Sequence, residues 1–271
     1  MIHTGSKSQP KAVAVIPARY SSTRLPGKPL LDIAGKPLVV WVAERARAAS
    51  SISRTIVATD DPRIVDAVSA AGFDAVITRA DHLSGTDRIA EVAHNLSADI
   101  IVNVQGDEPL IDPETIDRAV NALIEDSGAQ MSTTCEPITE AADLTNPSVV
   151  KVTFDENGYA TGFSRNPIPL QNQSVEKAAS LESSPDESGL LSDFRKHTGL
   201  YAYRRDFLLK FARWPASESE TRESLEQLRA LDRGVRIKVV EAASPSIGVD
   251  TPEDLERVRA MMSASVSVAD V

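Results

Sequence analysis

The stretch that decides the fold is residues 12–30, which read AVAVIPARYSSTRLPGKPL. It opens with a continuous apolar run, Ala12–Ile16, that has the length of one strand and is bounded by Pro17. An amphipathic segment follows at Leu38–Ala49. Continuous apolar strands that alternate with helical patterns are typical of a parallel sheet with helices on both faces. The stretch therefore predicts an α/β protein whose first strand leads into a basic loop.

The same alternation continues through the first half of the chain. Further strand-like runs, each followed by an amphipathic segment, lie at Thr55–Thr59, Ala75–Thr78 and Ile100–Gln105, and the segments that follow them are Ile64–Ala71, Ile89–Leu96 and Ile116–Ile124. Three pairs place a side-chain acceptor just before a proline and so predict helix starts, namely Asp61-Pro62, Asp112-Pro113 and Thr251-Pro252. The predicted fold class is α/β, a doubly wound and mostly parallel sheet.

The pattern changes after about residue 129, where strands outnumber helices. The predicted strands are Met131–Cys135, Val149–Phe154, Ala160–Phe163, His197–Tyr203 and Val235–Ala242, and the predicted helices lie near Phe207–Arg213, Ser224–Leu231 and Pro252–Met262. Residues 171–196 are polar and without a period, and they fit an exposed connector or an active-site lid. We expect a disordered N-terminal extension (1–11), one domain (12–262, with parts 12–128 and 129–262) and a frayed C-terminal tail (263–271).

Composition excludes several classes of function. The 271 residues include 39 acidic and 29 basic side chains, a formal net charge of −10, which disfavours binding to nucleic acid or to an anionic membrane. No segment has the roughly 18 consecutive apolar residues of a membrane span. The only cysteine, Cys135, has no partner for an internal disulfide. These features predict a cytoplasmic protein without membrane insertion.

The loop after the first strand concentrates positive charge. Arg19, Arg24 and Lys28 place three cations within ten positions of an acidic chain. Ligands of open α/β sheets bind beyond the carboxyl ends of the strands, so this loop suits a triphosphate. Its spacing matches neither G-x-x-x-x-G-K-[ST] nor G-x-G-x-x-G, which argues against P-loop and dinucleotide-binding readings. By composition alone, a solvated surface loop is the alternative.

Two carboxylates follow strands elsewhere in the chain. Asp107 comes directly after an apolar strand, and Asp250 lies between the last strand and the last helix. If both strands belong to the same sheet, the two side chains face each other, and Mg²⁺ is commonly held by one or two carboxylates together with substrate phosphates. The alternatives are a turn residue for Asp107 and a helix cap for Asp250. No Ser-His-Asp order supports a covalent intermediate.

Eight blocks of the sequence resemble the CMP-KDO synthetase family, the 3-deoxy-manno-octulosonate cytidylyltransferases. In chain order the blocks are Ile16–Leu30, Thr78–His82, Ser84–Arg88, Val102–Pro109, Phe163–Arg165, His197–Tyr201, Leu225–Arg229 and Gly248–Leu255. They span about residues 12–262. The resemblance implies transfer of CMP from CTP to the sugar acid KDO, with release of pyrophosphate, for lipopolysaccharide biosynthesis. It also implies a nucleotidyltransferase-like fold, a Mg²⁺ cofactor and a homodimer, with residues 12–128 mainly binding CTP and 129–262 mainly binding sugar and forming the dimer.

The resemblance also implies the site residues. Arg19, Arg24 and Lys28 would hold the triphosphate, and Ala18, Arg79 and Ser84 would lie around the cytosine. Asp107 and Asp250 would bind the metal and act in catalysis with Lys28 and Arg19. The sugar would be contacted by Gln105, Arg165, His197, Tyr201 and Glu226.

The sequence departs from the family pattern at one place. Relatives commonly follow Phe-Ser-Arg-x-x-Ile-Pro with an aromatic residue and a nearby arginine, whereas here Pro169 is followed by Leu170 and Gln171. A related acceptor, such as 8-amino-KDO, a nine-carbon sugar acid or a sugar phosphate, therefore remains an alternative. A nucleotide-binding module without turnover is a second, which the presence of two opposed carboxylates disfavours.

Overall fold

The computed structural model describes residues 10–21, 24–168, 191 and 194–269, the last six by their backbone alone. Its strands are β1 (Ala12–Ala18), β2 (Asp32–Ile33), β3 (Lys36–Pro37), β4 (Ile52–Thr59), β5 (Asp74–Ile77), β6 (Ile100–Asn103), β7 (Met131–Pro137), β8 (Lys151–Phe154), β9 (Ala160–Ser164), β10 (Arg195–Arg204) and β11 (Ile237–Glu241). Its helices are the 3₁₀ turn η1 (Lys28–Leu30), then α1 (Leu38–Ala48), α2 (Pro62–Ala70), α3 (Gly85–His94), α4 (Pro113–Glu125), α5 (Ala141–Thr145), α8 (Arg205–Phe211), α9 (Glu218–Glu223), α10 (Gln227–Leu231) and α11 (Pro252–Ala269).

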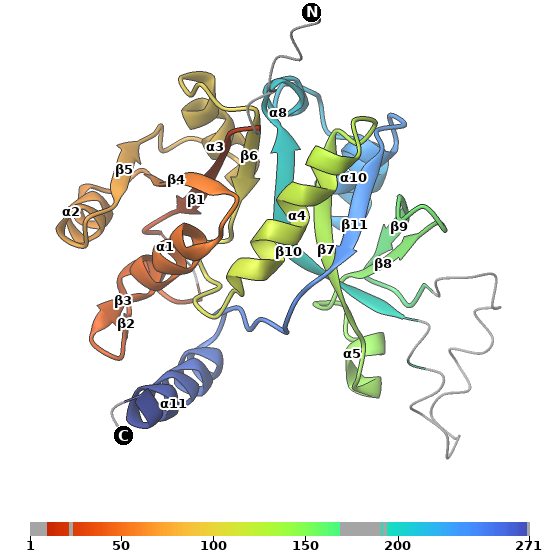
Figure 1. Cartoon of the computed structure of the whole chain (residues 1–271). Helices are drawn as coiled ribbons and strands as arrows, with labels where there is room; N and C mark the ends of the chain where they lie inside the picture. The colour runs from red at the N-terminus through yellow and green to blue at the C-terminus, as the bar shows by residue number, and fades with distance from the viewer. Residues whose placement is uncertain (1–9, 22–23, 169–190, 192–193, 270–271) are drawn as a thin grey trace, which may run out of the picture.

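The centre of the molecule is a nine-stranded sheet in the order β11-β7-β10-β6-β1-β4-β5, with β8 and β9 attached beside β10 (Figure 1). Strand β1 pairs in parallel with both β4 and β6, and β5 and β11 also pair in parallel with their neighbours. Strand β10 runs antiparallel to β6 and β7. The prediction of a doubly wound, mostly parallel α/β sheet is confirmed.

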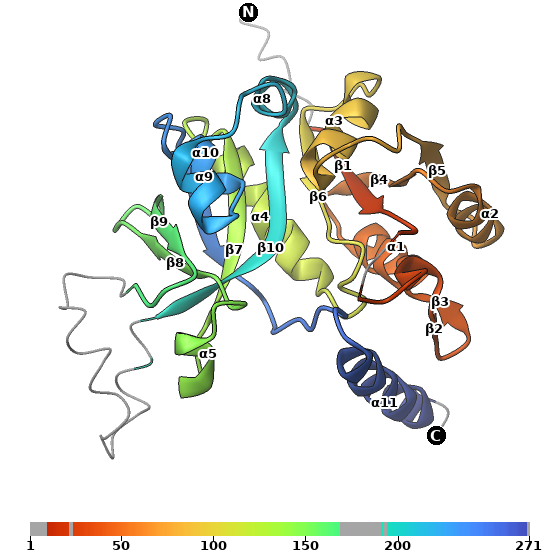
Figure 2. The same cartoon turned by 180° about the vertical axis from the view of Figure 1, so that it is seen from behind.

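Helices cover both faces of this sheet. Helices α1 and α4 lie on the face seen in Figure 1, and α3, α8 and α10 lie on the opposite face, seen in Figure 2. Alternate residues of β1 divide between two cores, with Ala14 and Ile16 on one side and Val13 and Val15 on the other. Because both faces are covered, this strand has no polar face, which explains the continuous apolar run.

The predicted helix starts are confirmed at α2, α4 and α11. Asp61 accepts a hydrogen bond from the N–H of Arg63, and Asp112 accepts one from Glu114 N–H. At α11, Thr251 Oγ1 accepts from the N–H of Asp254, whose carboxylate accepts from Thr251 N–H in return.

Three helix boundaries differ from the prediction. Helix α3 begins at Gly85, upstream of the apolar repeat, because a capping box between Ser84 and Asp87 starts it. The helix expected near Ser224–Leu231 is present as α10 but begins only at Gln227, because Ser224 adopts a left-handed conformation (φ 53°) and ends the preceding helix α9. Helix α11 continues to Ala269 through most of the segment expected to be a frayed tail.

Two predicted segments lie largely outside the described residues. They are the N-terminal extension, of which Pro10 and Lys11 are described, and the polar segment 171–196 together with the departure at Leu170 and Gln171. At its end, Arg195 and Lys196 belong to β10. In the part of the chain that the structure describes, no helix combines the length and apolar character of a membrane span.

Candidate functional site

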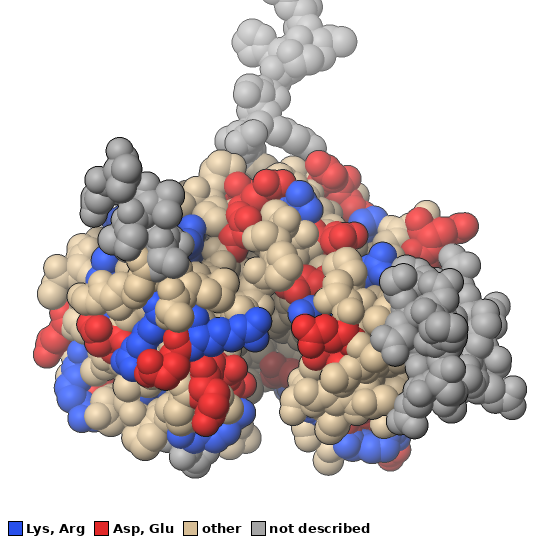
Figure 3. Space-filling view, turned by 90° about the horizontal axis from the view of Figure 1, so that it is seen from below, with Lys and Arg blue, Asp and Glu red and all other residues tan. Residues whose placement is uncertain are grey.

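Lys28 stands at the centre of a charged cluster at the carboxyl edge of the parallel strands. Its Nζ donates to Asp107 Oδ2 at 2.6 Å and to Asp250 Oδ1 at 2.9 Å. Arg24 Nη2 lies 3.3 Å from the same Asp250 oxygen. The basic loop, the loop after β6 and the segment before α11 therefore meet at one ammonium group, as the strand-end argument predicts. Figure 3 looks onto this side of the molecule, where the surface is hollowed between two lobes.

Backbone packing explains why these distant segments meet. A Cβ at Gly106 would lie only 2.6 Å from the carbonyl oxygen of Pro17, so only glycine lets the loop after β6 pack against the end of β1. The N–H of Val249 donates to the carbonyl of Asp107 at 2.8 Å, and Val249 is fully buried. Gly27, at a left-handed φ of 67°, turns the basic loop into η1.

The two carboxylates keep Lys28 charged. Burial alone would lower the pKa of Lys28, but the charges and hydrogen bonds of Asp107 and Asp250 raise it above the ordinary value. The Lys28 side chain is 15% exposed, whereas Asp107 and Asp250 are 31% and 49% exposed. The ammonium is thus enclosed, and the carboxylates remain open to a ligand from solvent.

The same carboxylates suit a hard divalent cation. Lys28 uses one oxygen of each, so Asp107 Oδ1 and Asp250 Oδ2 have no hydrogen-bond partner among the described residues. Within those residues no group of three or more His, Cys, Asp or Glu side chains could enclose a metal by itself. Two carboxylates open to further oxygen ligands form the arrangement that Mg²⁺ uses when substrate phosphates and water complete its shell. The donor set therefore fits the expected cofactor.

The other residues expected on the nucleotide side surround one loop, residues 79–84. Arg19 Nη2 donates to the carbonyl oxygen of His82 at 2.7 Å. The Arg79 side chain is 68% exposed and faces Asp81, with Nε 3.3 Å from Oδ1. Ser84 caps α3, and Ala18 ends β1 with only 3% of its surface exposed. Arg19 and Ser84 thus lie at this loop, while Arg79 points along its outer side.

Residues expected around the sugar lie on β10 and beside it. Gln105 Nε2 donates to the carbonyl of Gly199 at 2.9 Å, which joins the Asp107 loop to β10. The rings of His197 and Tyr201 lie 5.3 Å apart between centroids. His197 Nε2 hydrogen bonds to Thr133 Oγ1 at 2.8 Å. This part of the site is therefore continuous with the loop that carries Asp107.

Burial keeps the β10 groups neutral. It lowers the pKa of His197 to about 3. It also raises the pKa of Tyr201, with the charge of Glu226 acting in the same direction. Burial raises the pKa of Glu226 as well, although hydrogen bonds from Thr86 and Ser84 and the charge of Arg229 oppose the increase. These groups offer hydrogen bonds to a polyhydroxylated ligand and no compact positive charge.

Arg165, which was also expected to contact the sugar, makes its hydrogen bonds elsewhere. Its guanidinium donates to the backbone carbonyls of Glu223 at 2.7 Å, Pro147 at 2.9 Å and Ser224 at 3.4 Å. These bonds hold the junction between α9 and α10, where Ser224 is left-handed. In this structure Arg165 is therefore engaged by backbone acceptors and does not join the His197–Tyr201 pair.

The structure reveals a connection that sequence reasoning missed. Glu226 accepts hydrogen bonds from Ser84 Oγ at 3.2 Å and from Thr86 Oγ1 across 140 residues or more of sequence. The buried Arg229 donates to Glu226 Oε1 at 3.0 Å and to both carboxylate oxygens of Glu220. The start of α3 and the start of α10 are thereby joined. The blocks Ser84–Arg88 and Leu225–Arg229 carried the signal, although nothing in them gives their pairing.

Comparison with known proteins agrees with this arrangement. A family model described as cytidylyltransferase matches residues 13–237, which include both the basic loop and the Glu226 network. The solved structure of a CMP:2-keto-3-deoxy-manno-octonic acid synthetase complexed with CTP superposes with a TM-score of 0.84 and 46% identity, covering 94% of this chain and 99% of the other. A cytidylyltransferase from Leptospira borgpetersenii, 18% identical with a TM-score of 0.61, shares the fold.

Curated relatives narrow the class further. The 3-deoxy-manno-octulosonate cytidylyltransferase of Trichlorobacter lovleyi is 51% identical over 250 residues, 92% of this chain and 98% of that protein. The enzyme of the same name from Pseudomonas fluorescens is 54% identical over 254 residues, 92% of this chain and 97% of that protein. The chain belongs to the cytidylyltransferase family, among the 3-deoxy-manno-octulosonate cytidylyltransferases.

Proposed function

We propose that this protein transfers CMP from CTP to 3-deoxy-D-manno-octulosonate (KDO), giving CMP-KDO and pyrophosphate. The observation that carries the proposal is the convergence of Lys28, Asp107 and Asp250 from three segments at the carboxyl edge of the sheet. Relatives that cover more than nine-tenths of the chain carry this activity in their names. The product would supply lipopolysaccharide biosynthesis.

In the proposed mechanism the basic loop binds the triphosphate. Arg19, Arg24 and Lys28 neutralise its charge, and the loop at residues 79–84 lies near the cytosine. Mg²⁺ held by Asp107 and Asp250 would polarise the α-phosphoryl group and offset the charge that develops on it. The oxygen of the anomeric hydroxyl group forms a bond to the α-phosphorus as the bond from that phosphorus to pyrophosphate breaks, and the hydroxyl proton passes to solvent water. The chain itself mainly positions the two substrates, which makes the encounter effectively unimolecular.

The acceptor would lie against β10. Gln105, His197 and Tyr201 would donate and accept hydrogen bonds with its hydroxyl groups, and Glu226 would close the side toward α3. Because the His197 and Tyr201 side chains are neutral, the acceptor carboxylate requires a cation from elsewhere. Arg165 would serve if substrate draws it from the backbone carbonyls that it contacts. A related acceptor such as 8-amino-KDO is the second candidate, supported by the departure at Leu170.

We also propose that the enzyme is a cytoplasmic homodimer, with the part from residue 129 onward forming the dimer. The relatives' names support the biosynthetic role but not the assembly. Light scattering of the purified protein tests the assembly, with a mass of twice 29.1 kDa expected and a mass of 29.1 kDa contradicting it.

The thiol of Cys135 takes no part in the proposed reaction. Burial raises the pKa of this thiol to about 12, which suits a structural role.

Pyrophosphate release tests the activity. The purified protein is assayed with CTP, UTP and ATP against KDO, 8-amino-KDO and a nine-carbon sugar acid, each with and without Mg²⁺. We expect release with CTP and KDO that requires Mg²⁺. A faster reaction with 8-amino-KDO would move the assignment to that acceptor. Tight CTP binding without release in any combination would favour a binding module and contradict the proposal.

A further inference from the structure

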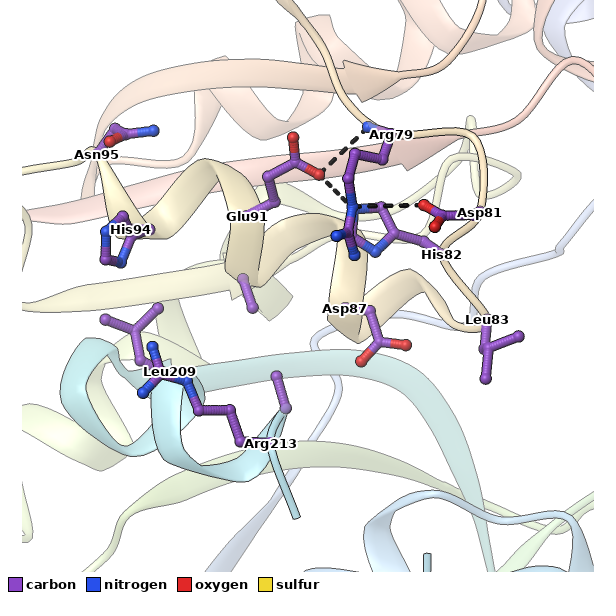
Figure 4. A pocket seen from close by; sticks show the side chains of 12 residues that line it. Arg79, Asp81, His82, Leu83, Asp87, Glu91, His94, Asn95, Leu209 and Arg213 are labelled. Carbon is purple, nitrogen blue, oxygen red and sulfur yellow. Dashed lines mark hydrogen bonds and ion pairs between the residues drawn. The ribbon is translucent and has the colours of Figure 1, made fainter. Parts of the chain in front are cut away.

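The loop at residues 79–84 is held from its outer side, away from the charged cluster. It borders a groove of about 710 Å³ between α3 and α8. Figure 4 shows Glu91 of α3 in this groove, with its carboxylate directed at the loop. Glu91 makes no contact with Lys28, Asp107 or Asp250 in the described residues. Any effect of Glu91 on the reaction must therefore act through the loop.

Glu91 fixes the loop at two points. Its Oε2 accepts a hydrogen bond from the backbone N–H of Arg79 at 3.2 Å. The same oxygen accepts a hydrogen bond from His82 Nε2. The His82 side chain is 5% exposed and that of Glu91 is 35% exposed, so the bond is largely sheltered from water. A sheltered bond to a charged acceptor is among the stronger hydrogen bonds in proteins.

The residue that Glu91 holds also holds Arg19. The carbonyl oxygen of His82 accepts from Arg19 Nη2 at 2.7 Å. The ring of His82 is thus fixed by α3, while its backbone fixes the guanidinium that follows β1. A free arginine side chain has about 2 kcal/mol of rotamer entropy, part of which is lost when a ligand immobilises it. Holding Arg19 in place before CTP arrives reduces that loss.

The residues around Glu91 stabilise the ionised form of its carboxylate. Burial alone would raise the pKa of Glu91, but the hydrogen bonds from His82 and from the backbone N–H of Arg79, together with coulombic attraction to these two residues, lower it below the ordinary value. At neutral pH the carboxylate is therefore ionised. An ionised carboxylate only accepts hydrogen bonds, which fixes His82 Nε2 as the donor.

We propose that Glu91 is a positioning residue, which orients Arg19 toward the triphosphate by fixing the His82 backbone. The inference rests on the proposed cytidylyl transfer and adds a residue outside the site to it. The relay runs from Glu91 through the His82 ring to the His82 carbonyl and then to Arg19. It predicts an effect on CTP and not on the sugar acid.

The primary experiment compares Glu91→Ala and Glu91→Gln with the wild-type enzyme. For Glu91→Ala we expect the KM for CTP to rise roughly 3- to 10-fold, the effect of one side chain that must be reordered on binding. The KM for the sugar acid and kcat should stay within about twofold. Glu91→Gln, which keeps an acceptor oxygen, should give a smaller increase. Glu114→Ala removes a carboxylate of α4 that pairs with Arg118 and serves as the matched control.

Two double variants test whether Glu91 acts through Arg19. With kcat/KM for CTP as the readout, Glu91→Ala should have little further effect in an Arg19→Ala enzyme. It should keep its full effect in an Arg24→Ala enzyme, because Arg24 pairs with Asp250 and not with His82. Equal effects in the two backgrounds, or equal increases in both KM values, would overturn the proposal. Equally weak CTP binding by Glu91→Gln and Glu91→Ala would do so as well.

Direct CTP titration separates this inference from the proposed function. If the wild-type protein binds CTP but transfers to no acceptor, the proposed function fails. The loss of CTP affinity in Glu91→Ala still decides the positioning role in that case. Unchanged CTP affinity in an active Glu91→Ala enzyme would end the inference and leave the proposed function intact.

Discussion

The two regions that we propose for the nucleotide and for the acceptor differ in their physical character. On the proposed nucleotide side, charged groups from the basic loop, the loop after β6 and the segment before α11 meet, and the enclosed Lys28 offsets the charges of the more exposed Asp107 and Asp250. On the proposed acceptor side, burial lowers the pKa of His197 to about 3 and raises that of Tyr201, so neither side chain carries a charge at neutral pH. In the proposed function, the first region would stabilise the charge of phosphoryl transfer, whereas the second would recognise the sugar through hydrogen bonds.

The largest expected effect is a loss of kcat on substitution of a carboxylate in the charged cluster around Lys28. Asp107→Asn should lower kcat roughly 10²-fold or more at saturating CTP, KDO and Mg²⁺, as does the removal of one preorganised electrostatic group in other enzymes. A stopped-time assay or a coupled enzymatic assay of pyrophosphate release gives kcat. Asp74→Asn, which removes a surface carboxylate paired with Arg54 at 2.7 Å, is the control. Turnover close to that of the wild type would refute the role of Asp107.

The Lys28→Met substitution tests the same cluster, because it removes the ammonium group that pairs with Asp107 and Asp250. We expect the KM for CTP to rise about tenfold or more, because a charged hydrogen bond to the triphosphate is lost. The thermal midpoint should also rise more with added Mg²⁺ than that of the wild type, since the cation then relieves the repulsion between Asp107 and Asp250. Scanning calorimetry with and without Mg²⁺ measures this. A smaller Mg²⁺ effect in the variant would contradict a shared metal site.

A substitution on the proposed acceptor side should change the KM for the sugar acid and leave the KM for CTP unchanged. Tyr201→Phe removes one hydroxyl group, and we expect the KM for KDO to rise about 3- to 10-fold, as for the loss of one hydrogen bond, with the KM for CTP unchanged. The matched control is Tyr203→Phe, because that ring stacks on Tyr201 with centroids 5.8 Å apart and is 2% exposed. Equal effects of the two variants would indicate a loss of packing instead of a lost substrate contact.

The smallest expected effect is on the pH dependence of the free energy of unfolding. Burial lowers the pKa of His197 to about 3 in the folded protein, so as the pH falls below about 6.5 the unfolded chain takes up the proton first. Stability is therefore unaffected above that pH and is lost progressively toward pH 3. Between pH 7 and 5 the wild-type free energy of unfolding should fall by roughly 1–2 kcal/mol more than that of His197→Gln. Urea unfolding at both pH values measures the difference, and parallel decreases would exclude a buried neutral imidazole.

The same contrast explains what the sequence could and could not predict. Strand-end reasoning predicted that Asp107 and the basic loop would meet, because parallel strands place their carboxyl ends at one edge. It also placed Asp250 there on the condition that its strand joined the same sheet, which the pairing of β11 with β7 satisfies. These arguments need only strand direction and order.

Contacts that depend on side-chain direction had no such signal. The late start of α10 follows from a left-handed Ser224, a conformation that is uncommon for residues other than glycine and that no local sequence pattern predicted. The bonds of Arg165 to backbone carbonyls and the bond between Glu91 and His82 join residues without a helical or strand period. The resemblance marked the blocks that contain Arg165 and His82 but could not say which atoms meet.

In the proposed mechanism, Asp107 and Asp250 together hold a divalent cation beside Lys28 and the triphosphate. The most direct test is a crystal of the enzyme with CTP and Mn²⁺, examined by anomalous diffraction at the manganese edge. We expect a manganese peak bound to oxygens of both carboxylates and to the nucleotide phosphates. A peak bound to neither carboxylate, with the Lys28 bridge between them intact, would contradict it.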